Sequence, residues 1–354
     1  MSDLGFQPQD EPPALKPAPR WRALARWEVL LLAVLGGTIA FGADVSPYFL
    51  NSTNLFFICL NVGEVAIMAL PLTLIVVTGE IDLSVASTLG LSGVLMAELF
   101  KHGWPIWPAM IMAVILGAFL GAFNGILVTR LGLPSLAVTI GTLTLYRGVA
   151  QGILPTDTIG GFPNGLASIG VVPIPHTHIP YSFAFFLALA LVFGVVLHAT
   201  PLGRSIYAIG AGQEAAFFAG IRVRRIKFWL FVLSGTMSGF AGVLWTLRFA
   251  SARYDAGTGM ELVVVTIVLL GGISIFGGRG TILGILLAVL VLGCLQTALT
   301  ADLMPAQDQN IVVGTLLVAS VIVPNGSELY RRARARLRSA GERRRAAAAH
   351  AEAG

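Results

Sequence analysis

Acidic residues that interrupt apolar stretches are the first candidates for chemistry in this sequence. Residues 78–84 (TGEIDLS) end one long apolar run and precede another. Two carboxylates between membrane-spanning helices are costly at membrane depth and so indicate a function or a partner. The same pattern is typical of a cytoplasmic turn in which Asp82 or Ser84 caps the next helix. The segment predicts either such a turn, which the spacing favours, or a direct substrate contact.

Two further charges lie within apolar stretches, Glu64 and Arg147. A charged side chain inside a span faces an aqueous cavity or a partner of opposite charge. We therefore expect Glu64, Asp82 and Arg147 to line a translocation pathway or to form ion pairs. The two cysteines form no CxxC pair, and the five histidines show no metal-ligand spacing. We predict no metal site and no catalytic residues.

The composition places these residues in a membrane protein. Of 354 residues, 56% are hydrophobic and only 12% are charged, and the mean hydropathy is +0.82. Soluble domains contain about a quarter charged residues, which excludes an ordinary globular enzyme. The regular alternation of a membrane β-barrel is absent. We predict an all-α, polytopic membrane protein with about ten spans, near residues 27–43, 56–77, 85–100, 106–129, 134–153, 181–199, 228–250, 260–276, 281–300 and 309–323.

The basic residues indicate how these spans are oriented. With a cytoplasmic N-terminus and ten spans, the inside segments hold most of the 23 Lys and Arg. This excess agrees with the positive-inside rule and predicts that both termini are cytoplasmic. We expect a cytoplasmic tail over residues 1–26, a transmembrane domain over 27–325 and a basic cytoplasmic tail over 326–354. A basic tail directly after a span favours contact with anionic lipids over nucleic acid.

The longest inside segment, residues 200–227, is the candidate contact for a cytoplasmic partner. Residues 213–219 are predicted to form a short helix that presents Glu214 either to a partner or to the membrane surface. No GxxxxGK[ST] phosphate loop occurs, and no soluble segment is long enough to fold as a ligand-binding domain. If the chain transports a solute, ATP hydrolysis and ligand capture thus belong to separate polypeptides.

Four motifs in this order resemble those of bacterial sugar-type ABC importer permeases of the ribose, xylose and rhamnose group. Residues 79–84 resemble the signature GGIDLS, and 132–143 resemble the stretch GLPSFIVTLGTL. Residues 207–221 resemble the cytoplasmic coupling region, and 271–281 resemble the run GGxSxFGGRGT. The sequence departs from the signature at Glu80, where the family has Gly.

The resemblance implies a permease subunit of the bacterial inner membrane without enzymatic activity of its own. Its partners would be cytoplasmic ATPase subunits that hold ATP and Mg²⁺, an extracytoplasmic binding protein, and a second permease chain, identical or different. The ATPase-coupling region corresponds to Gly203, Arg204, Gln213, Glu214, Ala215, Ala216 and Gly220. Asp157, Arg253 and Asp255 are candidate contacts for the binding protein.

Two stretches narrow the expected ligand. Residues 249–257 and 159–163 look closer to rhamnose and autoinducer-2 import permeases than to ribose permeases. We therefore expect a small polyhydroxylated ligand, with rhamnose first and autoinducer 2 or another pentose or hexose as the alternative. An ion-coupled secondary transporter, the rival function, would use buried carboxylates, for which Glu64 and Asp82 are the candidates.

Overall fold

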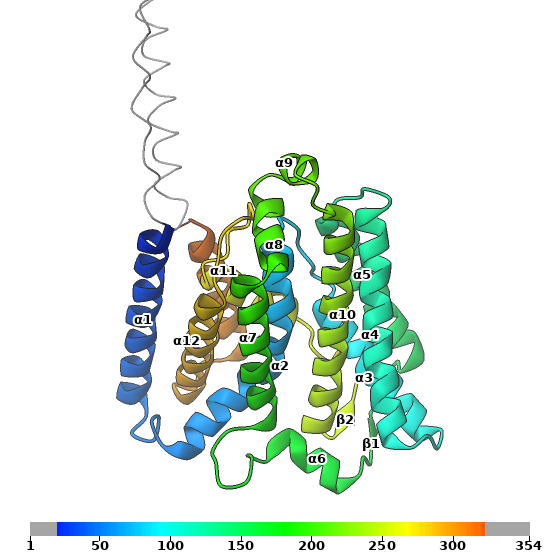
Figure 1. Cartoon of the computed structure of the whole chain (residues 1–354). Coiled ribbons are helices and arrows are strands. Elements are labelled where there is room, and N and C mark those ends of the chain that lie inside the picture. Colours follow the sequence, from blue (N-terminus) through cyan, green and yellow to red (C-terminus); the bar gives the residue numbers. More distant parts are fainter. Residues whose placement is uncertain (1–19, 323–354) are drawn as a thin grey trace, which may run out of the picture.

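The computed structural model describes residues 20–322, which are mostly helical (Figure 1). Two short strands, β1 (Ile159–Gly160) and β2 (Ser251–Ala252), pair antiparallel, with Ile159 opposite Ala252. Most of the two predicted tails lies outside the described residues. In chain order the helices are α1 (Arg20–Val45), α2 (Ser52–Val77), α3 (Val85–Lys101), α4 (Ile106–Thr129), α5 (Ser135–Ile153), α6 (Asn164–Val171), α7 (Tyr181–Ala199), α8 (Pro201–Ala211), α9 (Gln213–Phe218), α10 (Val223–Arg248), α11 (Met260–Leu270) and α12 (Ile282–Ala301), and a further helix covers Ala306–Ile322.

Each of the ten segments predicted to span the membrane contains a helix. Within residues 20–322, six helices are long and apolar enough to cross a membrane, namely α1 (from Trp27), α2, α4, α7, α10 and α12. The polytopic helical membrane fold is therefore confirmed. The count of ten spans and the side on which each terminus lies stay predictions.

The span predicted over residues 260–276 is longer than the helix observed there. α11 has 11 residues, or about 16 Å at 1.5 Å per residue, roughly half of a ~30 Å hydrocarbon core. It ends at Leu270 because Gly272, with φ of 82°, leaves the helical conformation. Gly277 and Gly278 also have positive φ, and they form a tight turn before α12.

The two ends of the molecule carry different short elements (Figure 1). α8 and α9 lie at one end, here called the α9 end, together with the start of α1. α6, β1 and β2 lie at the opposite end, here called the α6 end. The segment predicted as one inside loop, residues 200–227, is mostly helical, and the short helix expected over 213–219 is α9.

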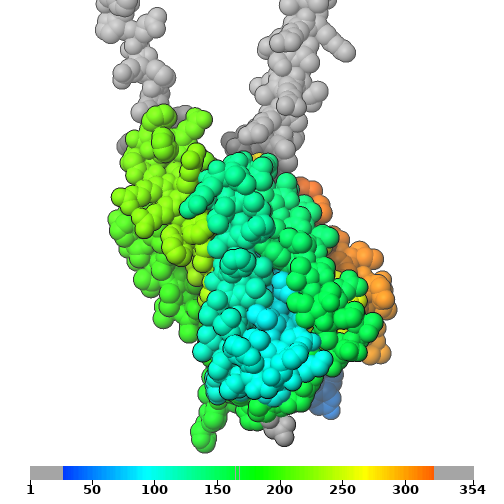
Figure 2. Space-filling view, turned by 90° about the vertical axis from the view of Figure 1, so that its right-hand side faces the viewer, coloured from blue at the N-terminus to red at the C-terminus, as the bar shows by residue number. Residues whose placement is uncertain are grey.

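α2 passes through the middle of the bundle, whereas α1 lies at its edge. The most apolar window of α2 is 78% buried, and that of α1 is 11% buried. Large apolar side chains of α4, among them Ile115 and Phe119, are exposed on a helix of the face shown in Figure 2. An apolar exterior of this kind suits contact with lipid or with another membrane chain.

Glycines bring α4 and α10 into direct backbone contact. Gly117 and Gly121 of α4 face Gly235 of α10, and a methyl group at any of these positions would collide with the opposite backbone. Small residues at this spacing permit close helix packing in membranes. α10 is thereby held at a fixed distance from α4, and it also packs against α2 and α3.

Residues 78–84, here called the α2–α3 segment, form a buried turn. Gly79 has φ of 83°, which reverses the chain after α2. Ser84 occupies the N-cap position of α3 but makes no side-chain capping bond. Asp82 instead accepts a hydrogen bond from the Ser84 amide, with its Oδ1 at 3.0 Å. The turn expected from the sequence is therefore present, with Asp82 enclosed between helices rather than exposed at the surface.

Candidate functional site: a polar seam along α10

Three polar side chains lie on one side of α10 and contact acidic residues elsewhere in the chain. Lys227, Ser234 and Arg248 are separated by about two and four helical turns, so they share one face of the helix. Their acidic partners are Glu80, Asp82 and Glu64. We call this line of contacts the polar seam.

At the α9 end of the seam, Lys227 joins three elements. Its Nζ donates to Glu80 Oε1 at 2.6 Å in the α2–α3 segment and to Gln213 Oε1 at 2.7 Å, the first residue of α9. Lys227 is only 5% exposed. A buried charge requires a partner, and Glu80 supplies it. Residue 80 is Gly in the signature that residues 79–84 resemble, and here it is the glutamate whose carboxylate compensates the charge of Lys227.

In the middle of the seam, Asp82 accepts hydrogen bonds from two hydroxyl groups. Its Oδ2 accepts from Ser234 Oγ at 2.8 Å, and its Oδ1 accepts from Ser84 Oγ at 2.7 Å. Asn124 Nδ2 of α4 donates to Ser84 Oγ at 2.8 Å, and Tyr146 of α5 donates to Asn124 Oδ1 at 3.3 Å. These contacts connect the carboxylate of Asp82 to α10, α4, α5 and the start of α3 through neutral groups.

At the α6 end of the seam, Arg248 binds Glu64, which is fully buried in α2. Arg248 Nη1 donates to Glu64 Oε2 at 3.0 Å and to the Leu60 carbonyl at 2.8 Å, and its Nη2 donates to Asn61 Oδ1 at 2.5 Å. Glu64 Oε1 has no hydrogen-bond partner among the described residues. The guanidinium carbon of Arg248 also lies 5.2 Å from the centre of the Phe249 ring, within cation–π distance.

The structure separates the three residues that the sequence proposed for a pathway. Glu64 and Asp82 both belong to the seam, but Arg147 does not. Arg147 Nη1 donates to the backbone carbonyls of Tyr254 at 2.8 Å and Ala256 at 2.6 Å. Arg147 therefore holds a loop after β2, and Glu64 finds its cation in Arg248.

The seam residues Lys227, Ser234 and Arg248 were not singled out from the sequence. A signal existed, because their spacing in multiples of seven residues is that of one helix face. Their partners lie far away along the chain, 147, 152 and 184 positions distant. Local patterns contain no information on such partners.

The residues of the expected coupling region lie together at the α9 end. Gly203 and Arg204 belong to α8, while Gln213, Glu214, Ala215 and Ala216 belong to α9, and Gly220 follows with φ of 83°. Glu214 and Ala215 are exposed, Ala216 is buried, and the rings of Phe217 and Phe218 are 65% and 84% exposed. α9 therefore offers an acidic and aromatic surface.

α8 is attached to the turn after α11. Tyr207 donates to the Gly280 carbonyl at 2.6 Å, and burial raises the pKa of Tyr207 to about 12, which keeps this donor protonated. The Gly278 amide donates to the Val77 carbonyl at 2.8 Å. Gly210 of α8 lies against the backbone of both residues. The α9 end is thus a connected layer in which α8, α2 and the α11–α12 turn touch.

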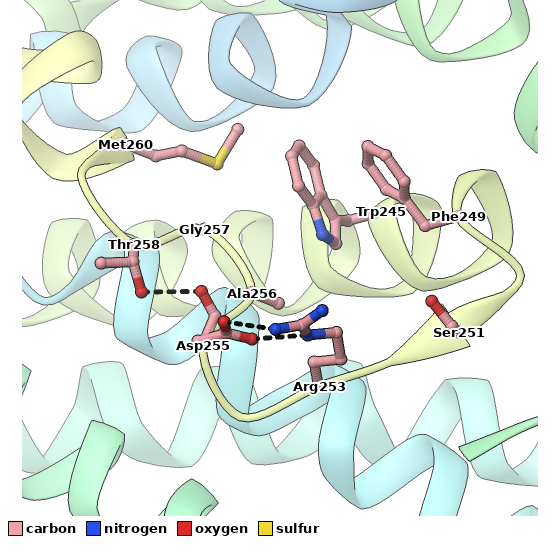
Figure 3. A pocket seen from close by; sticks show the side chains of 9 residues that line it. All are labelled: Trp245, Phe249, Ser251, Arg253, Asp255, Ala256, Gly257, Thr258 and Met260. Carbon is pink, nitrogen blue, oxygen red and sulfur yellow. Dashed lines mark hydrogen bonds and ion pairs between the residues drawn. The ribbon is translucent and has the colours of Figure 1, made fainter. Parts of the chain in front are cut away.

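The expected outer contacts lie at the α6 end. Arg253 and Asp255 form a bidentate pair, with Nε–Oδ1 at 2.9 Å and Nη2–Oδ2 at 2.8 Å. The hydrogen bonds from Arg253 lower the pKa of Asp255 below its usual value. Both residues line a pocket between the end of α10 and the start of α11 (Figure 3). Asp157 is exposed shortly before β1.

Comparison with known proteins identifies the class of molecule that contains this seam. Residues 54–321 match the family described as the permease component of the branched-chain amino acid transport system. The chain is 35% identical over 318 residues to the "Autoinducer 2 import system permease protein LsrD" of Salmonella paratyphi A, covering 88% of this chain and 94% of the relative.

Two further relatives bear the same name. The Klebsiella pneumoniae protein is 34% identical over 307 residues, covering 84% of this chain and 90% of the relative. The Escherichia coli O9:H4 protein is 35% identical over 312 residues, covering 86% and 93%. No solved structure matches the chain. The resemblance noted in the sequence is confirmed, and this chain belongs to the family of membrane-embedded, non-enzymatic permease subunits of ABC importers.

Proposed function

We propose that this importer permease carries a small polyhydroxylated ligand inward, and that autoinducer 2 is the first ligand to test. The curated relatives, which match most of the chain, are named for autoinducer 2 import. Rhamnose, expected first from the sequence, is not named by these relatives and becomes the second ligand to test.

In this proposal the α9 end faces the cytoplasm and the α6 end faces outward. Arg222, Arg224 and Arg225 lie around the start of α10 at the α9 end, in agreement with the positive-inside rule. α8 and α9 would dock on ATPase subunits that hold ATP and Mg²⁺. The α6 end would meet a binding protein, and a second permease chain, identical or different, would complete the transporter. Both termini would then be cytoplasmic.

The observation that carries the mechanism is the contact of Lys227 with both Gln213 and Glu80. A displacement of α9 would move Gln213 and, through Lys227, the α2–α3 segment that contains Asp82. The same segment is bonded to α5, because Ser135 Oγ accepts from the Ile81 amide at 3.1 Å. ATP binding could thereby bias two arrangements of the helices around Asp82, since an effector shifts only states that it contacts differently.

Uptake of labelled ligand in cells tests the function. Cells that express the neighbouring ATPase and binding protein are compared with and without this chain, using labelled autoinducer 2 and labelled rhamnose. We expect accumulation of autoinducer 2 to require the chain and a catalytically active ATPase. Uptake that does not require the ATPase and that collapses with the ion gradient would contradict the proposal and favour a secondary transporter.

A further inference from the structure

The pocket at the α6 end has a volume of about 370 Å³ and is the strongest candidate for a ligand site outside the seam. It lies between the last turn of α10, the loop after β2 and the first residue of α11 (Figure 3). Ligand pockets in proteins measure roughly 300–1,000 Å³, so this one suits a small molecule. Nothing in the family description or in the relatives' names assigns it a role.

The loop that lines the pocket packs against the bundle at α3. The loop from Arg253 to Gly259 packs on α3: a methyl group at Gly90 would meet the Ala256 carbonyl, and Gly257 lies near the Leu89 side chain. Positive φ values at Gly257 and Gly259 allow the chain to turn there. α11 then begins at Met260 and spans only about half of a hydrocarbon core, at 1.5 Å per residue.

The two sides of the pocket differ in chemistry. Trp245 and Phe249 lie on one side, with ring centres 4.5 Å apart. The Arg253–Asp255 pair lies on the other side in Figure 3. An aromatic face packs against apolar C–H groups, while the guanidinium and carboxylate groups form charge-assisted hydrogen bonds with hydroxyl groups. A sugar-like ring offers both kinds of surface.

The charge of the pocket favours a neutral ligand. Arg253 and Asp255 compensate each other in a bidentate pair, so neither sign of charge is in excess between them. An anionic or cationic ligand would have to break this pair to gain an ion pair of its own. Hydroxyl groups of a ligand can instead form hydrogen bonds with the outward-facing atoms of both side chains without separating the pair.

Two partly buried arginines hold both sides of the pocket in place. Arg147 binds the carbonyls of Tyr254 and Ala256, which fixes the loop that carries Arg253 and Asp255. Arg248, paired with Glu64, lies against the rings of Trp245 and Phe249. The site is therefore preformed, which reduces the cost of ordering on binding, and its aromatic side belongs to the outer end of the polar seam.

We infer that this pocket binds a neutral, polyhydroxylated ligand of monosaccharide size as it enters the permease. The inference rests on the proposed function, because it names the contact site for that class of ligand. It also changes the expected role of Arg253 and Asp255, which would contact the ligand itself rather than the binding protein.

Cysteine protection measures binding without transport. Ser251→Cys places a thiol in the pocket, and Ser52→Cys, at an exposed position at the start of α2, serves as the control. Both variants are placed in the complete importer without ATP and labelled with a maleimide, with the unmodified chain as background for Cys59 and Cys294. We expect millimolar autoinducer 2 or rhamnose to slow labelling at position 251 at least threefold and to leave position 52 unchanged. Equal labelling rates at position 251 with and without either compound would overturn the inference.

Uptake kinetics test the two sides of the pocket. Trp245→Ala and Arg253→Gln are expected to raise the KM for uptake about tenfold, which corresponds to about 1.4 kcal/mol. Trp107→Ala, an exposed tryptophan of α4, is the matched control and should leave KM unchanged. Arg253→Gln removes an exposed side chain, so it reports on the site even if Trp245→Ala fails to assemble with the ATPase.

The binding protein provides the decisive comparison. Its affinity for the importer should stay within twofold for Arg253→Gln; a loss of affinity that matches the loss of uptake would make the pocket a docking surface and overturn the inference. Protection at position 251 without any ATP-dependent uptake would contradict the proposed function and leave the pocket assignment standing. Normal uptake with an unchanged KM in both variants would overturn the pocket assignment and leave the proposed function standing.

Discussion

The two ion pairs of the seam are built from different parts of the molecule. Arg248 binds Glu64, Asn61 and the Leu60 carbonyl, which all belong to one stretch of α2. Lys227 binds one residue of the α2–α3 segment and the first residue of α9. The pair at the α6 end therefore fastens α10 to a single helix, whereas the pair at the α9 end joins α10 to two separate elements.

The chemistry of the two cations matches this difference. The planar guanidinium of Arg248 makes several directed hydrogen bonds at once and stacks on aromatic rings, and such a group holds one geometry. The ammonium of Lys227 is a compact charge on a flexible stem, so it can keep its contacts while they shift. We infer that Arg248 anchors α10 and that Lys227 is the joint through which α9 acts.

The largest effect is expected when the anchor is broken. Arg248→Ala leaves the carboxylate of Glu64 buried without a cation, and removal of one partner of a buried pair costs about 3–5 kcal/mol. We expect a lower unfolding temperature of the purified permease in detergent and little assembled transporter. The double variant Glu64→Gln with Arg248→Met removes both charges and should recover much of the stability. A single variant as stable as the unmodified chain would show that the pair is no anchor.

Replacing Lys227, the joint, should lower the stability less than replacing Arg248 does, and its main effect should be on transport. Lys227→Met leaves Glu80 without its cation, but Glu80 is partly exposed (19% of its side chain), so water replaces part of the lost interaction. We expect a loss of about 1–2 kcal/mol, below that of a fully buried pair, with uptake reduced at least tenfold while ATP is still hydrolysed. Uptake per ATP hydrolysed in proteoliposomes is the measurement.

A charge exchange separates a joint from a merely stabilising contact. Lys227→Glu combined with Glu80→Lys restores opposite charges at the same place, and we expect part of the uptake to return. Recovery of the unfolding temperature without recovery of uptake would contradict the proposal that Lys227 transmits the movement of α9 to the α2–α3 segment.

The centre of the seam should show a smaller effect. Ser234→Ala removes one of the hydrogen bonds that Asp82 accepts and leaves those from Ser84. A typical intramolecular hydrogen bond contributes about 0.5–1.5 kcal/mol. We expect a decrease of about 1 kcal/mol in the free energy of unfolding. Ser238→Ala is the control one helical turn away, since the Ser238 hydroxyl has no partner in the described residues.

The helices, and not their mutual contacts, could be predicted from the sequence. Long apolar runs located the ten segments, and the short helix predicted over residues 213–219 is α9. The pairing of Glu64 with Arg248 rather than Arg147 could not be foreseen, because it depends on how α2 and α10 pack. The short length of α11 was missed for a related reason. An apolar run does not reveal that Gly272 leaves the helical conformation and that α11 therefore ends at Leu270.

The smallest effect on stability is expected at α9, the element on which the ATPase would act to move Lys227. Glu214 is exposed, and its side chain makes no hydrogen bond or ion pair within the described residues, so Glu214→Arg should change the free energy of unfolding by less than about 0.5 kcal/mol. Its reversed charge should nevertheless weaken association with the ATPase and lower uptake. Co-purification of the ATPase with the variant measures this, and Asp44→Arg, at an exposed position near the end of α1, controls for the change of charge. If ATPase association and uptake are both unchanged in Glu214→Arg, the ATPase docks elsewhere, and the contact of Lys227 with Gln213 cannot transmit its movement.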